Sequence, residues 1–268
     1  MSAYLEIGRE NDKRIDCFIL EQNQCEPHFH SNIELIYLLE GETEATINGA
    51  THLLRPGEIS IAGSYDVHRY ITPARSRSIL LIIPVDLVPS FVSRSKGKTF
   101  GGHFLDAGPA AAQIRSAAEV LLAENADPDP LVCKGYAYAI LGVLCRELGL
   151  VRQPKTGTTE LAREILVFLE QHYLEDLNIE KLARAFGYNK DYLSRFFNAY
   201  LGCGFNRYLN LLRSRHAARL MDQTDQPLTA IAFQSGFGNY RTFNRAFAVS
   251  YGITPTAYKS QLRKDIQA

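Results

Sequence analysis

One short pattern occurs twice in the last third of the chain, and it constrains the fold more than any other feature. Leu182-Ala183 is followed by Gly187, and Ile231-Ala232 is followed at the same spacing by Gly236. One extra residue then shifts the match, after which Leu193-Ser194-Arg195-Phe196-Phe197 aligns with Phe243-Asn244-Arg245-Ala246-Phe247. A stretch that recurs in this way is expected to fold the same way twice. The C-terminal part is therefore predicted to hold two copies of one structural unit.

Each copy has the pattern of a helix-turn-helix motif. The alanine is small enough for a second helix to approach the first, and the glycine four residues later suits a turn that needs a positive φ. The second helix of each copy is amphipathic, with leucine and phenylalanine on its inward side. Its outward side is polar and partly basic: Lys190, Asp191, Ser194, Arg195 and Asn198 in the first copy, and Tyr240, Arg241, Asn244 and Arg245 in the second. The alternative is a pair of helical hairpins whose polar faces only meet solvent.

The 268-residue chain has no net charge, but its charges are unevenly distributed. From residue 178 to the end, 13 lysines and arginines stand against 5 aspartates and glutamates, a balance of +8, and the remainder of the chain carries −8. A basic end attached to an acidic body suggests a polyanion partner for that end. In the major groove of DNA, arginine pairs with guanine and asparagine with adenine. Four further arginines on or near the helix that joins the two copies could meet phosphates: Arg207, Arg213, Arg215 and Arg219.

The residues from 158 to 263 resemble the DNA-binding domain of the AraC/XylS family of bacterial transcriptional regulators. The most specific part is IAFQSGFGNYRTFNRAFAVSYGITPTAY, whose IA-x3-GF, F-x-RAF and G-x-TP-x2-Y elements fall in the family's order and spacing. The resemblance implies two helix-turn-helix units joined by one long helix, which enter consecutive major-groove segments on one face of the DNA. It implies base reading by Asp191, Ser194 and Arg195 in the first unit and by Tyr240, Arg241, Asn244 and Arg245 in the second, with Lys190 beside them. Asp191 departs from the family's pattern because it is acidic. An acidic side chain accepts a hydrogen bond from cytosine but repels phosphate.

The first half of the chain has a different pattern. Residues 14–84 contain short runs rich in Ile, Val, Tyr and Thr, separated by Gly, Asn or Pro, which predicts an antiparallel barrel or sandwich. Asn48-Gly49 predicts a hairpin with a type I′ turn. Two amphipathic segments within 108–150 predict an antiparallel helical hairpin. This hairpin either packs on the barrel or takes part in a dimer interface.

The stretch PHFHSNIELIY places His28, His30 and Glu34 at positions of equal parity, so on a single strand they would line one face. Their spacing resembles the first motif of the cupin family, and His68 occupies the fourth ligand position of a degraded second motif. Three imidazoles and a carboxylate could hold Fe, Ni, Mn or Zn. The resemblance to AraC-like sensing arms gives the same residues another meaning, as contacts to an organic effector, with Tyr37, Tyr65 and Tyr70 adding stacking surface or hydrogen bonds. A third reading is that these polar groups only satisfy one another.

Together these features predict an α+β chain of two domains. Residues 1–152 are expected to form a cupin-like β-barrel, at about 14–84, with a helical hairpin at about 108–150, for effector sensing and dimerisation. Residues 153–159 read as a linker, and 160–268 as an all-α DNA-binding domain with two helix-turn-helix units. No apolar run is long and unbroken enough to span a membrane, and the start has no apolar signal core. Five scattered cysteines without a Cys-x-x-Cys pair favour reduced thiols in the cytoplasm.

The leading prediction is a cytoplasmic transcriptional regulator, not an enzyme, that responds to a small molecule bound in the barrel. Its expected partners are double-stranded DNA, the small-molecule effector, RNA polymerase and a second copy of the chain. The main alternative is a metal-dependent cupin enzyme, such as a dioxygenase or an isomerase, fused to a DNA-binding domain. A weaker alternative is a DNA-binding protein whose barrel only dimerises. The chain has no Walker motif, nucleophile elbow or kinase signature.

Overall fold

The computed structural model describes residues 3–6, 8–9, 12, 14–152 and 158–265. The chain divides into two compact units, Met1–Thr156 and Gly157–Ala268. Of the predicted linker, residues 153–157 lie outside the described residues, and Thr158 and Thr159 begin a helix instead. In the described part of the chain, no helix has both the length and the apolar character that a membrane span needs.

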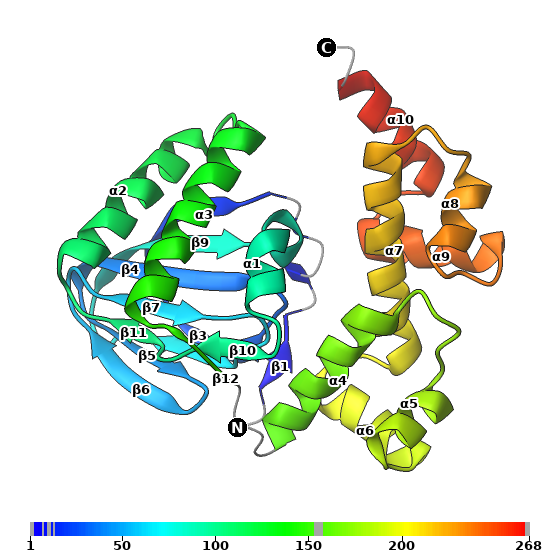
Figure 1. Ribbon diagram of the computed structural model, residues 1–268, viewed down its shortest axis with the longest axis horizontal. Helices are drawn as coiled ribbons and strands as arrows, with labels where there is room; N and C mark the ends of the chain where they lie inside the picture. The colour runs from blue at the N-terminus through cyan, green and yellow to red at the C-terminus, as the bar shows by residue number, and fades with distance from the viewer. Residues whose placement is uncertain (1–2, 7, 10–11, 13, 153–157, 266–268) are drawn as a thin grey trace. The chain divides into compact units, whose positions relative to one another are not determined.

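The N-terminal unit contains two five-stranded sheets (Figure 1). The first has the order β1 (Tyr4–Leu5), β3 (Cys25–Phe29), β8 (His68–Ile71), β5 (Thr43–Ile47) and β6 (Ala50–Leu54). The second has the order β11 (Phe104–Leu105), β7 (Ile59–Ala62), β4 (Ile33–Gly41), β9 (Ser76–Ile83) and β2 (Asp16–Glu21). All neighbouring strands are antiparallel except the short pair β1 and β3. The predicted hairpin turn is present, since Asn48 and Gly49 both have positive φ and Ile47 pairs with Ala50.

Apolar side chains from both sheets meet in one core between them. Its members are Ile36, Leu38, Leu80 and Ile82 from the second sheet and Ala45, Leu54 and Tyr70 from the first. Strands β4 and β9 each send alternate residues into this core, as a pleated strand must. The predicted fold class is confirmed, a β-rich domain followed by an all-helical one. Among the described strands, hydrogen bonds do not join the two sheets into one closed barrel.

The other face of the second sheet is covered by the helical hairpin expected over residues 108–150. It consists of α2 (Pro109–Glu124) and α3 (Pro130–Glu147), which lie side by side over β4 and β9 (Figure 1). Leu35 and Leu81 of the sheet share a core with Ile114 and Ile140 of the helices. Between β9 and α2 lie the short elements η2 (Val85–Leu87), α1 (Pro89–Arg94) and β10 (Lys98–Phe100), and β10 pairs with β12 (Leu150–Arg152). The inner face of the hairpin therefore packs on the sheet.

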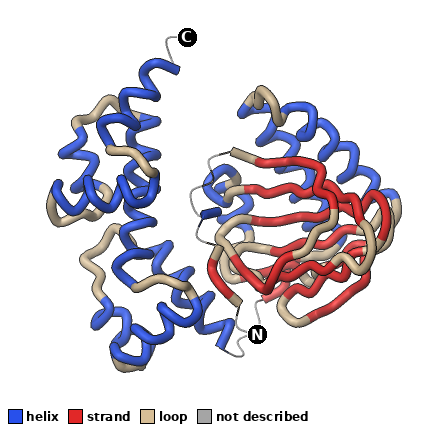
Figure 2. The backbone as a smooth tube through the Cα atoms, turned by 180° about the vertical axis from the view of Figure 1, so that it is seen from behind, coloured by secondary structure: helices blue, strands red, loops and turns tan. Residues whose placement is uncertain are grey.

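In the C-terminal unit, the regular elements among the described residues are all helices, joined by loops (Figure 2). It starts with α4 (Thr158–His172) and contains the two copies of the repeat as α5 (Ile179–Phe186) with α6 (Lys190–Tyr200) and α8 (Leu228–Gln234) with α9 (Tyr240–Tyr251). The long helix α7 (Phe205–Gln223) joins the copies, and α10 (Pro255–Asp265) follows. Gly187 has φ +72° and Gly236 has φ +80°, so both turns use the left-handed backbone that the repeat predicts.

Candidate nucleic-acid interface and buried histidine cluster

The second helix of each copy turns its apolar side towards the core, as its amphipathic pattern predicts. Leu193 and Phe197 of α6 and Phe243 and Phe247 of α9 are fully buried. Their opposite sides therefore face solvent. Six of the eight predicted DNA contacts are exposed, and Tyr240 and Asn244 are half-buried; the exposed ones are Lys190, Asp191, Ser194, Arg195, Arg241 and Arg245.

Both of these helices begin with the same capping interaction. The Asn189 side-chain oxygen accepts a 2.7 Å hydrogen bond from the backbone N–H of Tyr192, and the Asn239 oxygen accepts a 2.8 Å bond from Thr242. An asparagine cap satisfies a backbone donor that the first helical turn leaves free. The two caps are fifty residues apart, like the rest of the second half of the repeat. In the sequence, Asn189 and Asn239 directly precede these two helices at equivalent positions of the repeat, so the two caps add to the match between the copies.

Three arginines on the exposed faces are available to a ligand. In the part of the chain that the structure describes, Arg195, Arg241 and Arg245 form no ion pair and no side-chain hydrogen bond. Lys190 differs, since its Nζ lies 3.4 Å from Glu180 Oε1. Unpaired guanidinium groups on a helix of this kind suit guanine or phosphate, because no internal partner has to be given up on binding.

The arginines of α7 differ, because three of the four that were expected near phosphates already have partners within the unit. Arg213 donates from Nε to the carbonyl of Tyr173, at 2.7 Å, and from Nη2 to the carbonyl of Glu175, at 2.8 Å. Burial lowers the pKa of this guanidinium. Arg215 donates to both carboxylate oxygens of Glu170, and Arg219 donates to the Tyr173 hydroxyl. These side chains therefore hold α4 against α7, and only Arg207 remains exposed.

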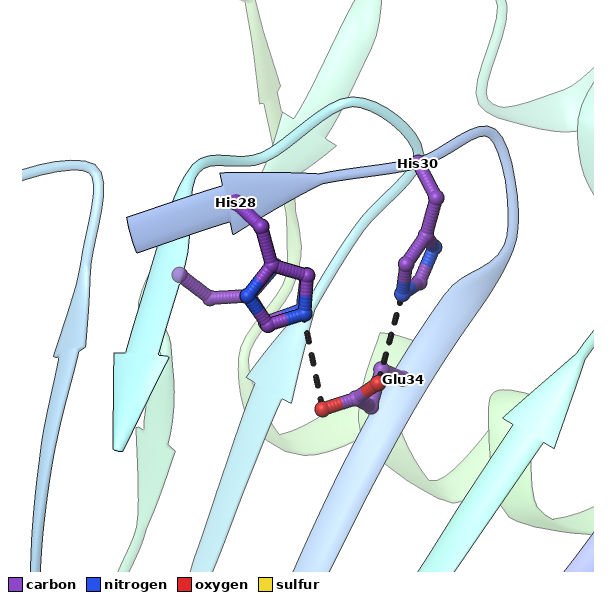
Figure 3. Close-up of side chains that lie close together, drawn as sticks. His28, His30 and Glu34 are labelled. Carbon is purple, nitrogen blue, oxygen red and sulfur yellow. Dashed lines mark hydrogen bonds and ion pairs between the residues drawn. The ribbon is translucent and has the colours of Figure 1, made fainter. Parts of the chain in front are cut away.

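The histidine cluster lies at one end of the space between the two sheets. His28 and His68 are opposite each other on β3 and β8, with ring centroids 4.2 Å apart. His30 follows the end of β3, and Glu34 comes from β4 in the facing sheet. All four side chains are buried, and one ligand atom from each lies within 4.8 Å of the others. Figure 3 shows the rings of His28 and His30 directed towards the Glu34 carboxylate.

The four residues lie together, as their spacing in the sequence predicts, but they do not all lie on one strand. Equal parity predicted one face of a single strand, whereas β3 ends at Phe29 and Glu34 belongs to a different strand in the opposite sheet. Two sheets therefore converge on the site. His68 joins it because its strand pairs directly with β3.

Each of the three histidines is held in the same way. The Nδ1 of His28 lies 2.9 Å from the Glu26 carbonyl, that of His30 lies 3.2 Å from the Asn32 carbonyl, and that of His68 lies 2.8 Å from the Asp66 carbonyl. A carbonyl only accepts, so Nδ1 carries the proton and donates in all three rings. In a neutral ring the Nε2 lone pair is then free and directed into the cluster.

Charge and burial compete at the site. Burial opposes ionisation of Glu34, but the charge of His68 and hydrogen bonds from His30 and His68 outweigh it, and the pKa of Glu34 lies well below its usual value. Burial lowers the pKa of His68 as well, yet the adjacent Glu34 carboxylate raises it overall. Burial, aided by the charge of His68, lowers the pKa of His28 to about 4. His28 is therefore a neutral imidazole at physiological pH, and Glu34 is ionised.

The predicted tyrosines do not all join the histidines. Tyr37 lies on the other face of β4, among the residues that pack against α2 and α3, because its odd position points it away from Glu34. The guanidinium of Arg115 lies 5.9 Å from its ring. Tyr70 lies in the core between the sheets, and burial followed by the nearby Glu34 charge raises its pKa well above the usual value. Tyr65 is buried and donates its backbone N–H to the carbonyl of His30.

The N-terminal segment also reaches the cluster, which the sequence does not predict. The two-residue strand β1 pairs with β3, which stacks the Tyr4 ring on His28, with centroids 5.7 Å apart. Two residues after Tyr4, the Oε2 atom of Glu6 lies 3.6 Å from His28 Nε2. A strand this short leaves no periodic signal in a sequence, so only the structure shows that the N-terminal segment reaches the site.

Comparison with known proteins gives two family matches. A helix-turn-helix domain matches residues 182–261, and the AraC-like ligand binding domain matches residues 18–141. Among curated relatives, an uncharacterized HTH-type transcriptional regulator of Staphylococcus aureus (strain COL) is 34% identical over 96 residues, which is 36% of this chain and 13% of that protein. The chain thus covers only a small part of the length of that relative. The probable transcriptional regulator LumQ of Photobacterium leiognathi is 24% identical over 238 residues, 88% of this chain and 92% of that protein.

Two solved structures also align with the chain. ToxT from Vibrio cholerae aligns at 12% identity and a TM-score of 0.42, covering 92% of this chain and 98% of that one. A protein from Listeria innocua aligns at 31% identity and a TM-score of 0.36, covering 37% of this chain and 95% of that one.

Proposed function

Because the chain belongs to the AraC/XylS family of transcriptional regulators, we propose that it binds specific DNA sequences through its C-terminal unit and responds to a small molecule through its N-terminal unit. The observation that carries the proposal is the pair of exposed, unpaired arginine faces on α6 and α9. Each stands on an equivalent helix, capped by an equivalent asparagine, in a repeated unit. Two such helices in one chain suit two consecutive major-groove segments, about 10 bp apart.

The proposed roles on the DNA follow from side-chain chemistry. Arg195, Arg241 and Arg245 are bidentate donors that suit guanine, and Asn244 suits adenine. Ser194 and Tyr240 can donate or accept at base edges or phosphates. Asp191 suits the amino group of cytosine, and Lys190 suits a phosphate once it leaves Glu180.

In the N-terminal unit, the proposed sensing site is the buried set His28, His30, Glu34 and His68. It lies at one end of a mainly apolar interior, so a ligand there would meet fixed, directional partners. A ligand switches a protein only if it binds two arrangements with different affinity. The proposed ligand therefore changes DNA binding only if its affinity for the DNA-binding-competent arrangement of the chain differs from its affinity for the other arrangement.

The remaining partners are part of the same proposal. A regulator of this kind acts on double-stranded DNA in the cytoplasm, as a homodimer, with RNA polymerase as the machinery it influences. The exposed side of the α2–α3 hairpin is the proposed contact between protomers. The metal-dependent enzyme alternative uses the same four residues, and a search for turnover by the purified full-length chain separates it from the regulator.

The test begins with genome-wide footprinting of the full-length chain, followed by binding assays on the mapped operator. Arg245→Ala and Arg195→Ala are each expected to weaken operator binding by ~1–3 kcal/mol if the arginine pairs with guanine. Arg115→Ala is the matched control, because Arg115 is also exposed but belongs to α2 in the N-terminal unit. The proposal would be refuted by an absence of discrete footprints, or by operator affinities that neither C-terminal variant changes.

A further inference from the structure

We propose that Arg213 is a positioning residue that fixes the two recognition helices, α6 and α9, relative to each other, and so sets the operator spacing that the chain selects. This rests on the proposed function, because it concerns how the two helices read one DNA molecule together. Arg213 lies on α7, along which both copies of the repeat are arranged (Figure 1). Its side chain lies where the loop 173–178 meets the turn of the second copy.

The guanidinium of Arg213 holds the loop 173–178, which leads from α4 into α5 of the first copy. Its Nε donates to the carbonyl of Tyr173 at 2.7 Å, and its Nη2 donates to the carbonyl of Glu175 at 2.8 Å. Two donors on one planar group fix both the distance and the orientation of the segment that they bind. The loop therefore has a defined position on α7.

The same loop is joined to α5. The Nζ of Lys181 donates to the carbonyl of Asp176, at 2.6 Å, and to its carboxylate, at 2.7 Å. The hydrogen bond and the charge of Lys181 lower the pKa of the Asp176 carboxyl, and the charge of Arg213 adds to this effect. Because α6 packs on α5, a displacement of the loop would also displace the first recognition helix.

The loop also contacts the turn of the second copy. A Cβ built on Gly236 would lie 3.0 Å from Arg213 Nε, 3.1 Å from the Leu174 carbonyl oxygen and 3.2 Å from the Leu174 Cα. We call these three residues, Leu174, Arg213 and Gly236, the inter-copy contact. A Cβ on the equivalent Gly187 would meet no described atom within 4 Å. A turn of this type does not require such a close approach, which instead reflects how the two copies meet.

Packing on α7 alone would leave the second copy some freedom to rotate. Its core joins Met221 of α7 to Ile231 of α8 and Phe247 of α9. Apolar contacts are not directional, so they tolerate small rotations about the helix axis. The hydrogen bonds of Arg213 add a second, directional point of attachment next to Gly236. Two points of attachment fix a rotation that one leaves free.

A fixed relation between α6 and α9 makes operator spacing part of recognition. One base pair added between the two half-sites moves one of them by about 3.4 Å and rotates it by about 35° around the DNA axis. A chain that holds the inter-copy contact loses the base contacts of one recognition helix on such an operator. Since a good base contact is worth about 5- to 150-fold in affinity, we expect the native chain to bind operators of altered spacing at least about 10-fold more weakly.

The experiment measures the affinity of the full-length chain for the footprinted operator in three forms: with its native spacing, with one base pair inserted and with one deleted. Arg213→Lys keeps the positive charge but loses the forked pair of donors. It is expected to reduce the preference for native spacing to about twofold, because a second copy that can rotate keeps its base contacts on all three operators.

Arg215→Lys is the matched control. Arg215 also lies on α7, but its hydrogen bonds to Glu170 join α7 to α4 itself, so this variant should keep the native preference. The inference is overturned if the native chain has no spacing preference, or if Arg215→Lys reduces it as much as Arg213→Lys does. It is also overturned if Arg213→Lys weakens binding to all three operators equally, as loss of a phosphate contact would.

Asp176→Lys is the second variant, should circular dichroism show that Arg213→Lys does not fold. The Asp176 side chain is 93% exposed, so the core stays intact, but the new charge repels Lys181 and Arg213 and should displace the loop. We expect the spacing preference to fall about two- to fivefold, the size of an exposed ion pair, and an unchanged preference would contradict the inference.

These measurements also separate the role of Arg213 from the proposed function. Discrete footprints with a spacing preference that neither variant changes overturn the role of Arg213 and leave the regulator. An absence of discrete footprints overturns the regulator itself, and the inference with it.

Discussion

Alanine at Gly236 should destabilise the C-terminal unit more than alanine at Gly187, although the two glycines occupy the same turn of the repeat. Both have positive φ, so an added Cβ brings a similar backbone cost of roughly 1–2 kcal/mol at each position. Their surroundings differ. A Cβ at Gly187 meets no atom within 4 Å, whereas a Cβ at Gly236 lies 3.0 Å from Arg213 Nε and 3.1 Å from the Leu174 carbonyl oxygen.

Neither neighbour of Gly236 can move away easily. Arg213 is fixed by its hydrogen bonds to the carbonyls of Tyr173 and Glu175, and Leu174 is the backbone residue between those two. Overpacking of this kind typically adds about 1–3 kcal/mol. We therefore expect Gly187→Ala to cost about 1–2 kcal/mol and Gly236→Ala about 2–5 kcal/mol.

Urea unfolding of the full-length chain, followed by circular dichroism at 222 nm, measures both losses. The chain has no tryptophan, so tyrosine emission serves as the second probe. Amide hydrogen exchange in α8 and α9 assigns the change to the C-terminal unit rather than to the hairpin of the N-terminal one. Equal losses in the two variants, or a larger loss at Gly187, would refute the reasoning from the Arg213 contact.

Two further predictions follow from the contacts described. Arg215→Met should lower the free energy of unfolding by about 1–3 kcal/mol, because it removes both hydrogen bonds that the Glu170 carboxylate accepts from Arg215; an unchanged urea midpoint would argue against a stabilising contact between α4 and α7. Burial raises the pKa of Cys17 to about 12, so its thiol should stay unmodified by a thiol reagent at pH 8 in the folded chain and react after unfolding, as mass spectrometry of labelled peptides can check.

The C-terminal unit was largely predictable because its signals are local. Helical periodicity, turn glycines and a repeat all lie within a few residues of the structure they specify, and Phe197 and Phe247 are buried as their spacing requires. What the sequence concealed there was the use of the α7 arginines, since the carbonyls that Arg213 contacts lie about forty residues away in sequence. The sequence alone does not distinguish an arginine that binds phosphate from one whose hydrogen bonds join two helices.

The N-terminal unit was less predictable for a physical reason. Strand β9 is buried on both faces, between the sheet core and the helices, so it reads as a continuous apolar run without alternation. Strand β3 contains Pro27, which weakens any strand signal. The cluster was found through the spacing of its motif, but Glu6 was not, because a non-local contact from a two-residue strand leaves no pattern.

The three histidine anchors have a consequence for how the chain can evolve. Each Nδ1 proton is held by the main-chain oxygen of Glu26, Asn32 or Asp66, two residues from the ring that it orients. No amino-acid replacement at those three positions removes a main-chain oxygen. The exposed side chain of Glu26 can therefore change while the His28 tautomer persists. The side chains of Asn32 and Asp66 are buried and hydrogen-bonded, so a change there would act through their own packing rather than through the loss of the anchor. Chains that share the ring positions but differ at the anchors are expected to present the same three nitrogens inward.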